Sequence, residues 1–410
     1  MNDKERTKEY WLKKIMNKEC TIEQAADSLG LSTRQVKRLK KGYIEKGVES
    51  VIHGNLNRKP KHAISEEMKK EIVNLKISER YNDANIAHFY DLIKEYEMKE
   101  IKIKYETVFK ILKEAGIKSP KKHRKKKQHP RRKRVDGFGK LLQIDATPYN
   151  WFGDGRKYNL HGAIDDATSK ITSLYMLENE CLEGYFQLME RTFKEHGRPE
   201  SIYSDRHLIL HPLKEMTIID QLEGRTEYES HFSRAMHKLN IRMIKAYSPE
   251  AKGRVERLWG TLQSRLPVEF KINNIKTVEE ANKFLMKYIP KFNKRFGIND
   301  ETIERIFRSL PENTKLRYIL CREEKRKLNV GCTISLSNRI FKVKTDKIPY
   351  NSKVSVLISK KIGIVVEYKG EYYQTELFED RRTEGQYGTQ CEVIDKMVMR
   401  SLKEVSNFLG

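Results

Sequence analysis

The sequence predicts a multidomain α/β protein, and three features of its pattern lead to this class. Apolar residues at helical spacing fill the first part of the chain, short apolar runs begin near Leu141, and alternating runs typical of strands return from Lys327. With 410 residues, of which 38% are hydrophobic, the chain can bury several separate cores. We therefore expect N-terminal helical modules, a central mixed sheet with helices, and a small C-terminal β-barrel.

The charge balance indicates a polyanionic partner. Lys and Arg number 82 against 57 Asp and Glu, which gives a formal net charge of +25, and such a surplus is typical of proteins that neutralise nucleic-acid phosphates. The N-terminus is too polar for a signal peptide, and no apolar run approaches the ~18 residues that a membrane span needs. Five cysteines without a CxxC pair argue against a disulfide framework and a Cys-rich zinc site. We expect a cytoplasmic protein with no membrane partner.

Two capping boxes mark the first domain, residues 1–55. Thr21 precedes Gln24, and Ser32 precedes Gln35, at the capping-box spacing, which predicts a helix-turn-helix. An ordinary helical hairpin has the same spacing, but the charge of the chain favours DNA binding. The second helix would present donor-rich side chains to DNA: Thr33, Arg34, Gln35, Lys37 and Arg38.

A second helical block is expected at residues 62–118. Its last segment, IKIKYETVFKILKEAGI, has an apolar helical face with lysines beside it, which favours a second helix-turn-helix-like DNA-binding unit.

The next stretch, KSPKKHRKKKQHPRRKRV, contains no acid and cannot bury itself. We place a basic linker at residues 119–136. Such a run is often only a solvated tail, but here it joins DNA-reading modules to the rest of the chain. Its expected contacts with DNA phosphates include Lys125, Lys126, Arg131 and Arg132.

The central region, residues 137–300, shows strands, a helix and another strand in order. The runs LLQID, NLHGAIDDAT and KITSLYML precede the helix-like CLEGYFQLMERTFKEHG and the run ESIYSD. Because WFGDG offers a hairpin turn after the first run, the sheet should be mixed and begin with an antiparallel meander. A later helix should begin at Ser248, with Pro249 at its first position.

Three acids lie where this arrangement would expose them. Asp145 ends the first predicted strand, Asp205 ends the strand after the long helix, and Glu256 lies on the helix that begins at Ser248. Converging carboxylates repel one another unless a cation neutralises them, and hard oxygen ligands select Mg²⁺ or Mn²⁺. Two such ions can clamp the attacking and leaving oxygens of a phosphodiester. Neighbouring cations would hold the DNA backbone: Lys252, Arg254 and Arg257.

At this point the residues resemble a known family. QIDATPYNWF, AIDDATSKI, IYSDRH and SPEAKGRVERLWGTLQSRLP are similar to motifs of the DDE-type transposases of bacterial insertion sequences, which carry an integrase catalytic core, closest to the ISNCY group. The resemblance covers nearly the whole chain. It implies a ribonuclease H-like core with Asp145, Asp205 and Glu256 as the metal ligands and two Mg²⁺ or Mn²⁺ ions in the active complex. It also implies cleavage at transposon ends and joining of the freed 3′ hydroxyl to target DNA.

The chain departs from this family at two places. The interval from Asp205 to Glu256 is longer than in many relatives, and an insertion near HLILHPLKEMTIIDQLEGRTEY would account for it. Gln263 stands where many relatives carry Lys or Arg, although Arg265 lies close.

Other interpretations compete with these site residues. Any one of the three acids could be a turn former or a surface residue, and Asp165 and Asp166 are interpreted as caps of a turn. HFSR, from His231 to Arg234, imitates the HxxR of tyrosine recombinases, but no second set of Arg, His and Tyr follows. Trp259 belongs to an apolar helical stripe and is interpreted as core packing.

The C-terminal part divides into three segments. Residues 301–326 look like a helical connector, and alternating runs at 327–380, with a turn at Lys369 and Gly370, predict a small β-barrel. The resemblance makes this barrel similar to the SH3-like barrels of related integrases, with a DNA or protein contact role, and a plain structural module is equally compatible. Residues 381–410 have the spacing of an amphipathic helix.

We therefore expect a transposase that binds the terminal inverted repeats of its own insertion sequence and performs metal-dependent strand cleavage and transfer. Its partner would be double-stranded DNA, as transposon ends and as target, and two ends imply at least a dimer on DNA. Its place would be the bacterial cytoplasm, associated with the nucleoid. Two alternatives stay open: a nuclease of the same fold that cuts without joining, and a DNA-binding regulator with an inert core.

Overall fold

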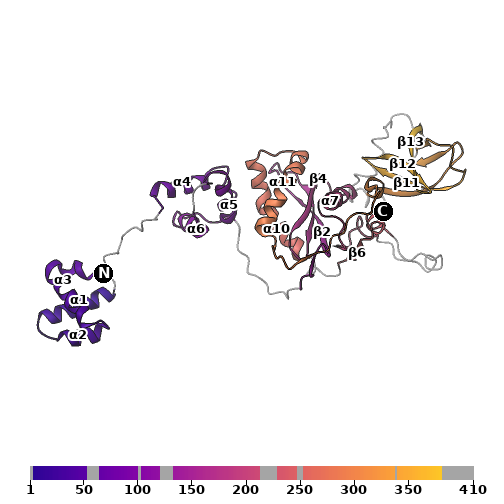
Figure 1. Ribbon diagram of the computed structural model, residues 1–410. Helices are drawn as coiled ribbons and strands as arrows, with labels where there is room; N and C mark the ends of the chain where they lie inside the picture. Colours follow the sequence, from indigo (N-terminus) through magenta and orange to yellow (C-terminus); the bar gives the residue numbers. More distant parts are fainter. Residues whose placement is uncertain are drawn as a thin grey trace. The chain divides into compact units, whose positions relative to one another are not determined.

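The computed structural model describes residues 3–52, 64–99, 103–120, 133–212, 229–246, 253–337 and 339–380. Most of the predicted basic linker, the predicted helix start at Ser248 and Pro249, and the C-terminal segment 381–410 lie outside the described residues. The chain divides into two compact units, Met1–Val73 and Asn74–Gly410. Figure 1 shows the chain and labels many of its helices and strands.

Residues 3–52 of the first unit form three α-helices and a 3₁₀ helix around a small core. They are α1 (Asp3–Met16), α2 (Ile22–Leu29) and α3 (Thr33–Lys46), followed by the 3₁₀ helix η1 (Gly47–Val51). Both predicted capping boxes are confirmed, at the start of α2 and at the start of α3. Gly30 ends α2 with φ of 63°, a left-handed conformation that favours glycine. Leu12 and Val36, both fully buried, join these helices.

Three further helices follow: α4 (Glu66–Ile77), α5 (Ile86–Tyr96) and α6 (Tyr105–Glu114). Helix α5 contacts the later helix α10 (Gly253–Ile272) through polar side chains. His88 Nε2 lies 3.1 Å from Glu269 Oε1, and both side chains are buried. Arg265 Nη2 lies 2.8 Å from Asp91 Oδ2. One face of α5 is therefore used to bind the central region of its own chain.

The central sheet has five strands in the order β4-β3-β2-β5-β6. They are β2 (Leu141–Tyr149), β3 (Tyr158–Asp165), β4 (Ile171–Leu177), β5 (Ser201–Ser204) and β6 (Arg242–Lys245). The pairs β2–β3 and β3–β4 are antiparallel, whereas β2–β5 and β5–β6 are parallel. The predicted mixed sheet that begins with a meander is therefore confirmed.

Helices cover both faces of this sheet, as Figure 1 shows. Helices α7 (Leu182–Glu195) and α9 (His231–Lys238) pack on one face, and α10 and α11 (Val278–Phe296) pack on the other. Side chains alternate along β2, so Ile144 and Ala146 enter the cluster with α7 and α9. Gln143 and Asp145 bond to α10 instead. Within the described ranges, no helix has the length and apolar character to cross a membrane.

The region predicted as a helical connector is mostly irregular. It contains β7 (Glu304–Arg305), which pairs in parallel with β1 (Gly137–Phe138), and the short helix α12 (Leu316–Ile319). The helical expectation for 301–326 was wrong over most of its length because the segment SLPENT contains proline and turn-forming residues.

A second sheet of six strands forms a nearly closed barrel. The order is β8-β11-β12-β13-β10-β9, and β8 also contacts β9. The strands are β8 (Arg322–Lys327), β9 (Thr333–Leu336), β10 (Arg339–Val343), β11 (Lys353–Ser359), β12 (Gly363–Tyr368) and β13 (Glu371–Asp380). The predicted turn between β12 and β13 is confirmed, and Lys369 and Gly370 both have positive φ, 50° and 85°.

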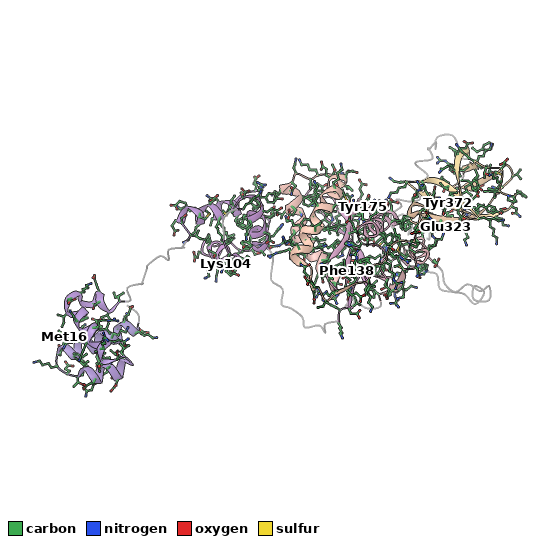
Figure 2. All side chains as sticks on the ribbon, in the orientation of Figure 1. Met16, Lys104, Phe138, Tyr175, Glu323 and Tyr372 are labelled. Atoms are coloured by element: carbon green, nitrogen blue, oxygen red, sulfur yellow. The ribbon has the colours of Figure 1, made fainter. Side chains whose placement is uncertain are left out.

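Charged side chains join the barrel to the central region. Glu323, labelled in Figure 2, accepts hydrogen bonds from Arg234 and from Lys238, the latter at 2.8 Å. Arg234 also donates to the carbonyl oxygens of Ile319 and Cys321, at 3.0 and 2.6 Å. This arginine therefore anchors β8, and its structural role agrees with rejecting HFSR as a recombinase motif.

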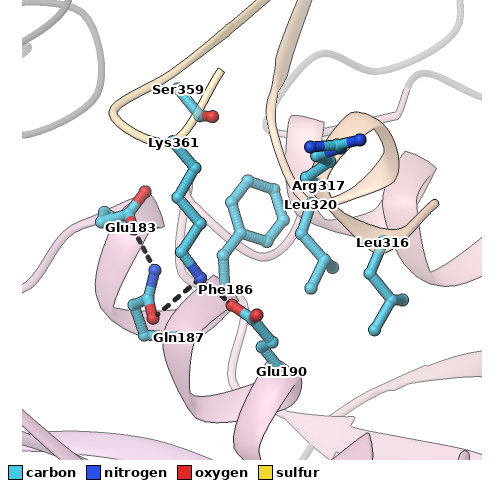
Figure 3. Close-up of a pocket in the computed structure, with 9 residues that line it drawn as sticks. All are labelled: Glu183, Phe186, Gln187, Glu190, Leu316, Arg317, Leu320, Ser359 and Lys361. Atoms are coloured by element: carbon cyan, nitrogen blue, oxygen red, sulfur yellow. Dashed lines mark hydrogen bonds and ion pairs between the residues drawn. The ribbon is translucent and has the colours of Figure 1, made fainter. Parts of the chain in front are cut away.

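A second contact involves the turn that joins β11 to β12. Figure 3 shows Lys361 reaching Glu190 and Gln187 on α7, beside the ring of Phe186. The barrel is thus held to two helices of the same sheet face, α9 and α7.

We expect Glu323→Gln to weaken the fold in a pH-dependent way. Burial alone would raise the pKa of the Glu323 carboxyl, but the hydrogen bond from Lys238 and the charge of Arg234 lower it to about 2. Its contribution is therefore present above the unfolded pKa and is lost as the pH falls toward 2. Urea unfolding should show a loss of about 2 kcal/mol at pH 7, and the loss should shrink by more than half near pH 3.

Glu376→Gln is the control for this prediction, because Glu376 forms an exposed ion pair with Lys344 on the same barrel. An exposed pair contributes under about 1 kcal/mol. Equal effects of the two substitutions would contradict the assigned role of Glu323.

Candidate active site

The first two predicted acids lie on neighbouring strands. In the parallel pair β2–β5, Gln143 is opposite Tyr203, so the same register extended by two residues brings Asp145 beside Asp205. Hydrogen-bonded strands lie about 4.8 Å apart. The charges of both aspartates also act on one nearby carboxyl group, that of Glu180. Asp145 and Asp205 therefore share one region at the end of β5.

Asp145 does not end its strand, contrary to the sequence prediction. Strand β2 continues to Tyr149 and is paired with β3 from Leu142 to Tyr149. The parallel neighbour β5, however, stops at Ser204. Asp145 therefore lies just beyond the part of β2 that pairs with β5, and its side chain is half-buried.

Helix α10 is fastened to β2 by three hydrogen bonds in register. Four residues of a helix rise about 6 Å and two residues of a strand rise about 6.6 Å, so groups with these spacings meet repeatedly. The three bonds run from Val255 N to Gln143 Oε1 at 3.3 Å, from Trp259 Nε1 to Asp145 Oδ2 at 2.9 Å, and from Gln263 Nε2 to Thr147 Oγ1 at 3.3 Å. We call this set the α10–β2 ladder. It fixes both the rotation and the height of α10 above the sheet.

Glu256, the third predicted acid, lies in the first turn of α10 and is exposed. It precedes Trp259 by three residues and so lies one turn away on a similar side of the helix. Within the described ranges, no three His, Cys, Asp or Glu side chains are arranged to hold a metal ion. The structure thus brings Asp145 and Asp205 together and holds the helix of Glu256 against the strand of Asp145.

A fourth acid of this region, Glu180, was not predicted from the sequence. Its Oε1 accepts a 2.6 Å hydrogen bond from the hydroxyl of Tyr185, a residue 1% exposed, and lies 3.5 Å from His207 Nδ1. Burial raises the pKa of the Glu180 carboxyl, and the charges of Asp145 and Asp205 raise it further. Its only sequence signal is that it lies between a strand and a helix, a position that many structural acids share.

The loop after β5 is held by histidines. His207 donates its backbone N–H to Asp205 Oδ1 at 3.3 Å. His211 Nε2 lies 2.8 Å from the hydroxyl oxygen of Ser204, and both side chains are buried. Burial lowers the pKa of His211 to about 4, so its ring is neutral at pH 7. These contacts fix the backbone on which Asp205 lies.

Asp165 caps a turn, as interpreted from the sequence, whereas Asp166 pairs with an arginine instead of capping the turn. Asp165 Oδ2 accepts hydrogen bonds from the backbone N–H and the hydroxyl of Thr168, both at 2.7 Å, and so caps the turn after β3. Asp166 lies 2.5 Å from Arg254 Nε and accepts a 2.9 Å hydrogen bond from Gln143. Both aspartates are fully buried.

The cations predicted to hold DNA near Glu256 have different environments. Arg254 is 8% exposed and paired with Asp166, so its burial favours a structural role over a DNA contact. Arg257 is exposed. Lys252 lies outside the described residues.

The predicted DNA-reading face of α3 is open to solvent. Within residues 33–38, Val36 is buried and the other five side chains are exposed: Thr33, Arg34, Gln35, Lys37 and Arg38. Gln35 also accepts a hydrogen bond from the backbone N–H of Ser32, at 3.1 Å, within the capping box. The predicted linker contacts Lys125, Lys126, Arg131 and Arg132 lie outside the described residues.

Comparison with known proteins gives two curated relatives and no matching family model. The chain is 37% identical over 370 residues to the transposase for insertion sequence IS1202 of Streptococcus pneumoniae, which covers 82% of this chain and 77% of the relative. It is 32% identical over 332 residues to the protein y4bF of Sinorhizobium fredii, also named a transposase, with coverage of 80% and 70%.

Solved structures give weaker likenesses. A simian T-cell lymphotropic virus intasome in complex with PP2A regulatory subunit B56 gamma covers 74% of this chain and 97% of its own, at 14% identity and a TM-score of 0.31. The HTLV-2 integrase catalytic core domain in complex with magnesium, in its trimeric form, covers 41% of this chain and 95% of its own, at 17% identity and a TM-score of 0.29. At these scores the likeness carries no weight for fold or function.

We expect Glu180→Gln to stabilise the metal-free protein at pH 7. The charged form of Glu180 is disfavoured by burial and by the two aspartates, so its pKa is raised. A raised carboxyl pKa means that stability is highest below the unfolded pKa and is lost as the pH rises through the folded pKa. In a buffer with a chelator, urea unfolding should show a gain of about 1 kcal/mol at pH 7 that disappears below about pH 4.

Glu178→Gln is the matched control, because Glu178 is an exposed glutamate two residues earlier. A gain for this control equal to that for Glu180→Gln would show that the effect comes from net charge and not from the neighbouring aspartates.

Proposed function

The chain belongs to the family of insertion-sequence transposases, and from that premise we propose how it acts on DNA. It binds the terminal inverted repeats of its own insertion sequence and cuts and joins DNA strands with divalent metal ions held by Asp145, Asp205 and Glu256. The observation that carries this proposal is the register of β2 and β5, in which Gln143 pairs with Tyr203, two residues before Asp145 and Asp205. The α10–β2 ladder adds the helix of Glu256 to the same region.

We propose that the central sheet is a ribonuclease H-like core. Three antiparallel strands followed by two parallel ones, with helices on both faces, support this assignment. The six-stranded barrel that follows corresponds in this proposal to an SH3-like domain that contacts DNA or a second copy of the chain.

The residues of the site fit a magnesium or manganese ion in their chemistry. Carboxylate oxygens are the ligands that these hard cations prefer. The charges of Asp145 and Asp205 both act on the Glu180 carboxyl, whose pKa is raised mainly by burial and further by these two charges. A divalent cation would relieve this repulsion. When bound, two such ions activate the attacking oxygen and stabilise the leaving oxygen of a phosphodiester.

The chain itself supplies orientation. Trp259 donates to the carboxylate of Asp145, and the backbone N–H of His207 donates to Asp205. These neutral donors hold two ligands without cancelling their charge. The ladder keeps the helix of Glu256 at a fixed height above Asp145.

DNA binding rests on charge outside the site. The net charge of +25 supports binding to phosphates. The exposed face of α3 is the proposed reader of the inverted repeats, and Arg257, exposed and next to Glu256, is the proposed phosphate contact beside the site. Two transposon ends require at least two chains on DNA. The proposed reaction would take place on the bacterial chromosome in the cytoplasm.

The test of the proposed chemistry is Asp145→Asn, which keeps the shape of the side chain and removes its charge. With Mg²⁺, labelled transposon-end DNA and a target plasmid, we expect the wild type to yield joined product. The variant should bind the end DNA with unchanged affinity and lose strand transfer by at least about 10³-fold. Gel analysis of cut and joined DNA measures both steps.

The same assay separates the alternatives. Cut ends without joined product in the wild type would indicate a nuclease. Equal behaviour of Asp145→Asn and the wild type would indicate a DNA-binding regulator with an inert core, and would contradict the proposed function.

The proposed role of α3 predicts a loss of DNA affinity on removal of its exposed arginines. Arg34→Ala with Arg38→Ala should weaken binding to the end DNA by about tenfold or more and reduce the salt dependence of binding, because each phosphate contact releases counterions. Fluorescence anisotropy at several salt concentrations measures both quantities.

Arg6→Ala is the control, since Arg6 is an exposed arginine on α1 of the same unit. If Arg6→Ala weakens DNA binding by as much as Arg34→Ala or Arg38→Ala alone, the binding depends on net charge and α3 has no special role.

A further inference from the structure

Trp259 connects the helix of one predicted metal ligand to another ligand. It lies three residues after Glu256 on α10, and its indole N–H donates to Asp145 Oδ2 at 2.9 Å. The side chain is 7% exposed and belongs to the core cluster between the sheet and helices α10 and α11. One tryptophan therefore combines packing in the core with a hydrogen bond to a carboxylate of the site.

The indole is suited to this role by its chemistry. It is a donor only, with no acceptor, and it is neutral at every ordinary pH. A lysine or arginine in its place would pair with the carboxylate and compete with a metal ion for its charge. The indole N–H fixes the orientation of the carboxylate and leaves the charge in place for the cation.

A glycine makes room for the ring. Gly162 on β3 lies opposite Asp145 in the antiparallel register. A Cβ atom at Gly162 would lie 2.6 Å from Trp259 Cη2 and 3.2 Å from Leu174 Cδ2. Because the ring is buried, such a Cβ could be accommodated only if the indole moved. The indole of Trp259 thus lies between Asp145, which accepts its N–H, and Gly162, whose missing side chain leaves space for the opposite edge of the ring.

The chain contains a second buried tryptophan for comparison. Trp151 is fully buried in the same core cluster, and its indole N–H donates to the backbone carbonyl of Tyr158 at 2.9 Å. The two tryptophans have similar burial and each makes one hydrogen bond of the same length. They differ in what accepts the bond, a backbone oxygen for Trp151 and a site carboxylate for Trp259.

We propose that Trp259, seated on Gly162, is a positioning residue that orients the carboxylate of Asp145 for divalent-cation binding. This inference rests on the proposed function, because it takes Asp145 as a metal ligand. Through the same bond, Trp259 ties the helix of Glu256 to the strand of Asp145, so a loss of the N–H disturbs two ligands. Groups that hold a metal ligand typically affect metal affinity by about 10–100-fold.

The test compares Trp259→Phe with Trp151→Phe in the full-length protein. Both substitutions keep an aromatic ring and remove one N–H. The probe is Mn²⁺ alone, with free Mn²⁺ measured by electron paramagnetic resonance, and thermal unfolding without metal as a second measurement. We expect similar shifts in the unfolding temperature, and a Mn²⁺ affinity about tenfold weaker for Trp259→Phe only. The proposal is overturned if the fold-loss of Mn²⁺ affinity in Trp259→Phe is less than three times the fold-loss in Trp151→Phe.

Gly162→Ala provides a second route to the same result, because it keeps the indole and displaces it. It should also weaken Mn²⁺ binding.

Asp145→Asn distinguishes a failure of the proposed function from a failure of the positioning role of Trp259. If Asp145→Asn binds Mn²⁺ like the wild type, the proposed function fails, whereas a loss with Asp145→Asn but none with Trp259→Phe overturns the positioning role alone.

A spectroscopic measurement needs no change at Trp259. The chain has three tryptophans, so the variant Trp11→Phe with Trp151→Phe keeps Trp259 as the single emitter. Its emission should change on addition of Mg²⁺ with the same midpoint as the binding curve of that variant. An emission that does not respond to a saturating concentration of Mg²⁺ overturns the proposal.

Discussion

The arrangement of the candidate site depends on the match between the rise of a helix and the rise of a strand. Groups four residues apart on α10 meet groups two residues apart on β2, because both steps cover about 6 to 6.6 Å. A slip of α10 by one residue would break all three bonds. Carboxylates that repel one another need other groups of the fold to keep them close. The α10–β2 ladder supplies neutral groups of this kind.

Burial separates two groups of cations within the described residues. Two buried arginines have carboxylate partners, Arg254 with Asp166 and Arg265 with Asp91, and the half-buried Arg234 pairs with Glu323. Removing one partner of a buried pair leaves an uncompensated charge and strongly destabilises the fold, so these cations serve the structure. Exposed cations such as Arg257 and those of α3 remain for a polyanion in solvent. Charge is thus separated by burial: the paired arginines stabilise the fold, and the exposed cations are those to which the proposed function assigns DNA contacts.

The sequence was sufficient for features that depend on local pattern. Apolar runs predicted the mixed sheet, and the spacing of Thr21 and Ser32 predicted both capping boxes. The extent of β2 beyond Asp145 was missed because it depends on pairing with β3, which local propensity does not encode. Glu180 was missed because its neighbours Asp145 and Asp205 are distant in sequence. The helical stripe correctly predicted that Trp259 is buried, but not its bond to a residue 114 positions away.

The ladder gives a physical meaning to the departure at Gln263. Where the resemblance leads one to expect Lys or Arg, the Gln263 amide donates to Thr147 Oγ1 and forms the last bond of the ladder. A cation at this position could reach a phosphate, but it would give up a short neutral contact with β2. The nearby Arg265 does not replace it, because that side chain is 7% exposed and paired with Asp91 on α5. Arg257 of α10, by contrast, is exposed and adjacent to Glu256, which is why the proposed function assigns the phosphate contact to it.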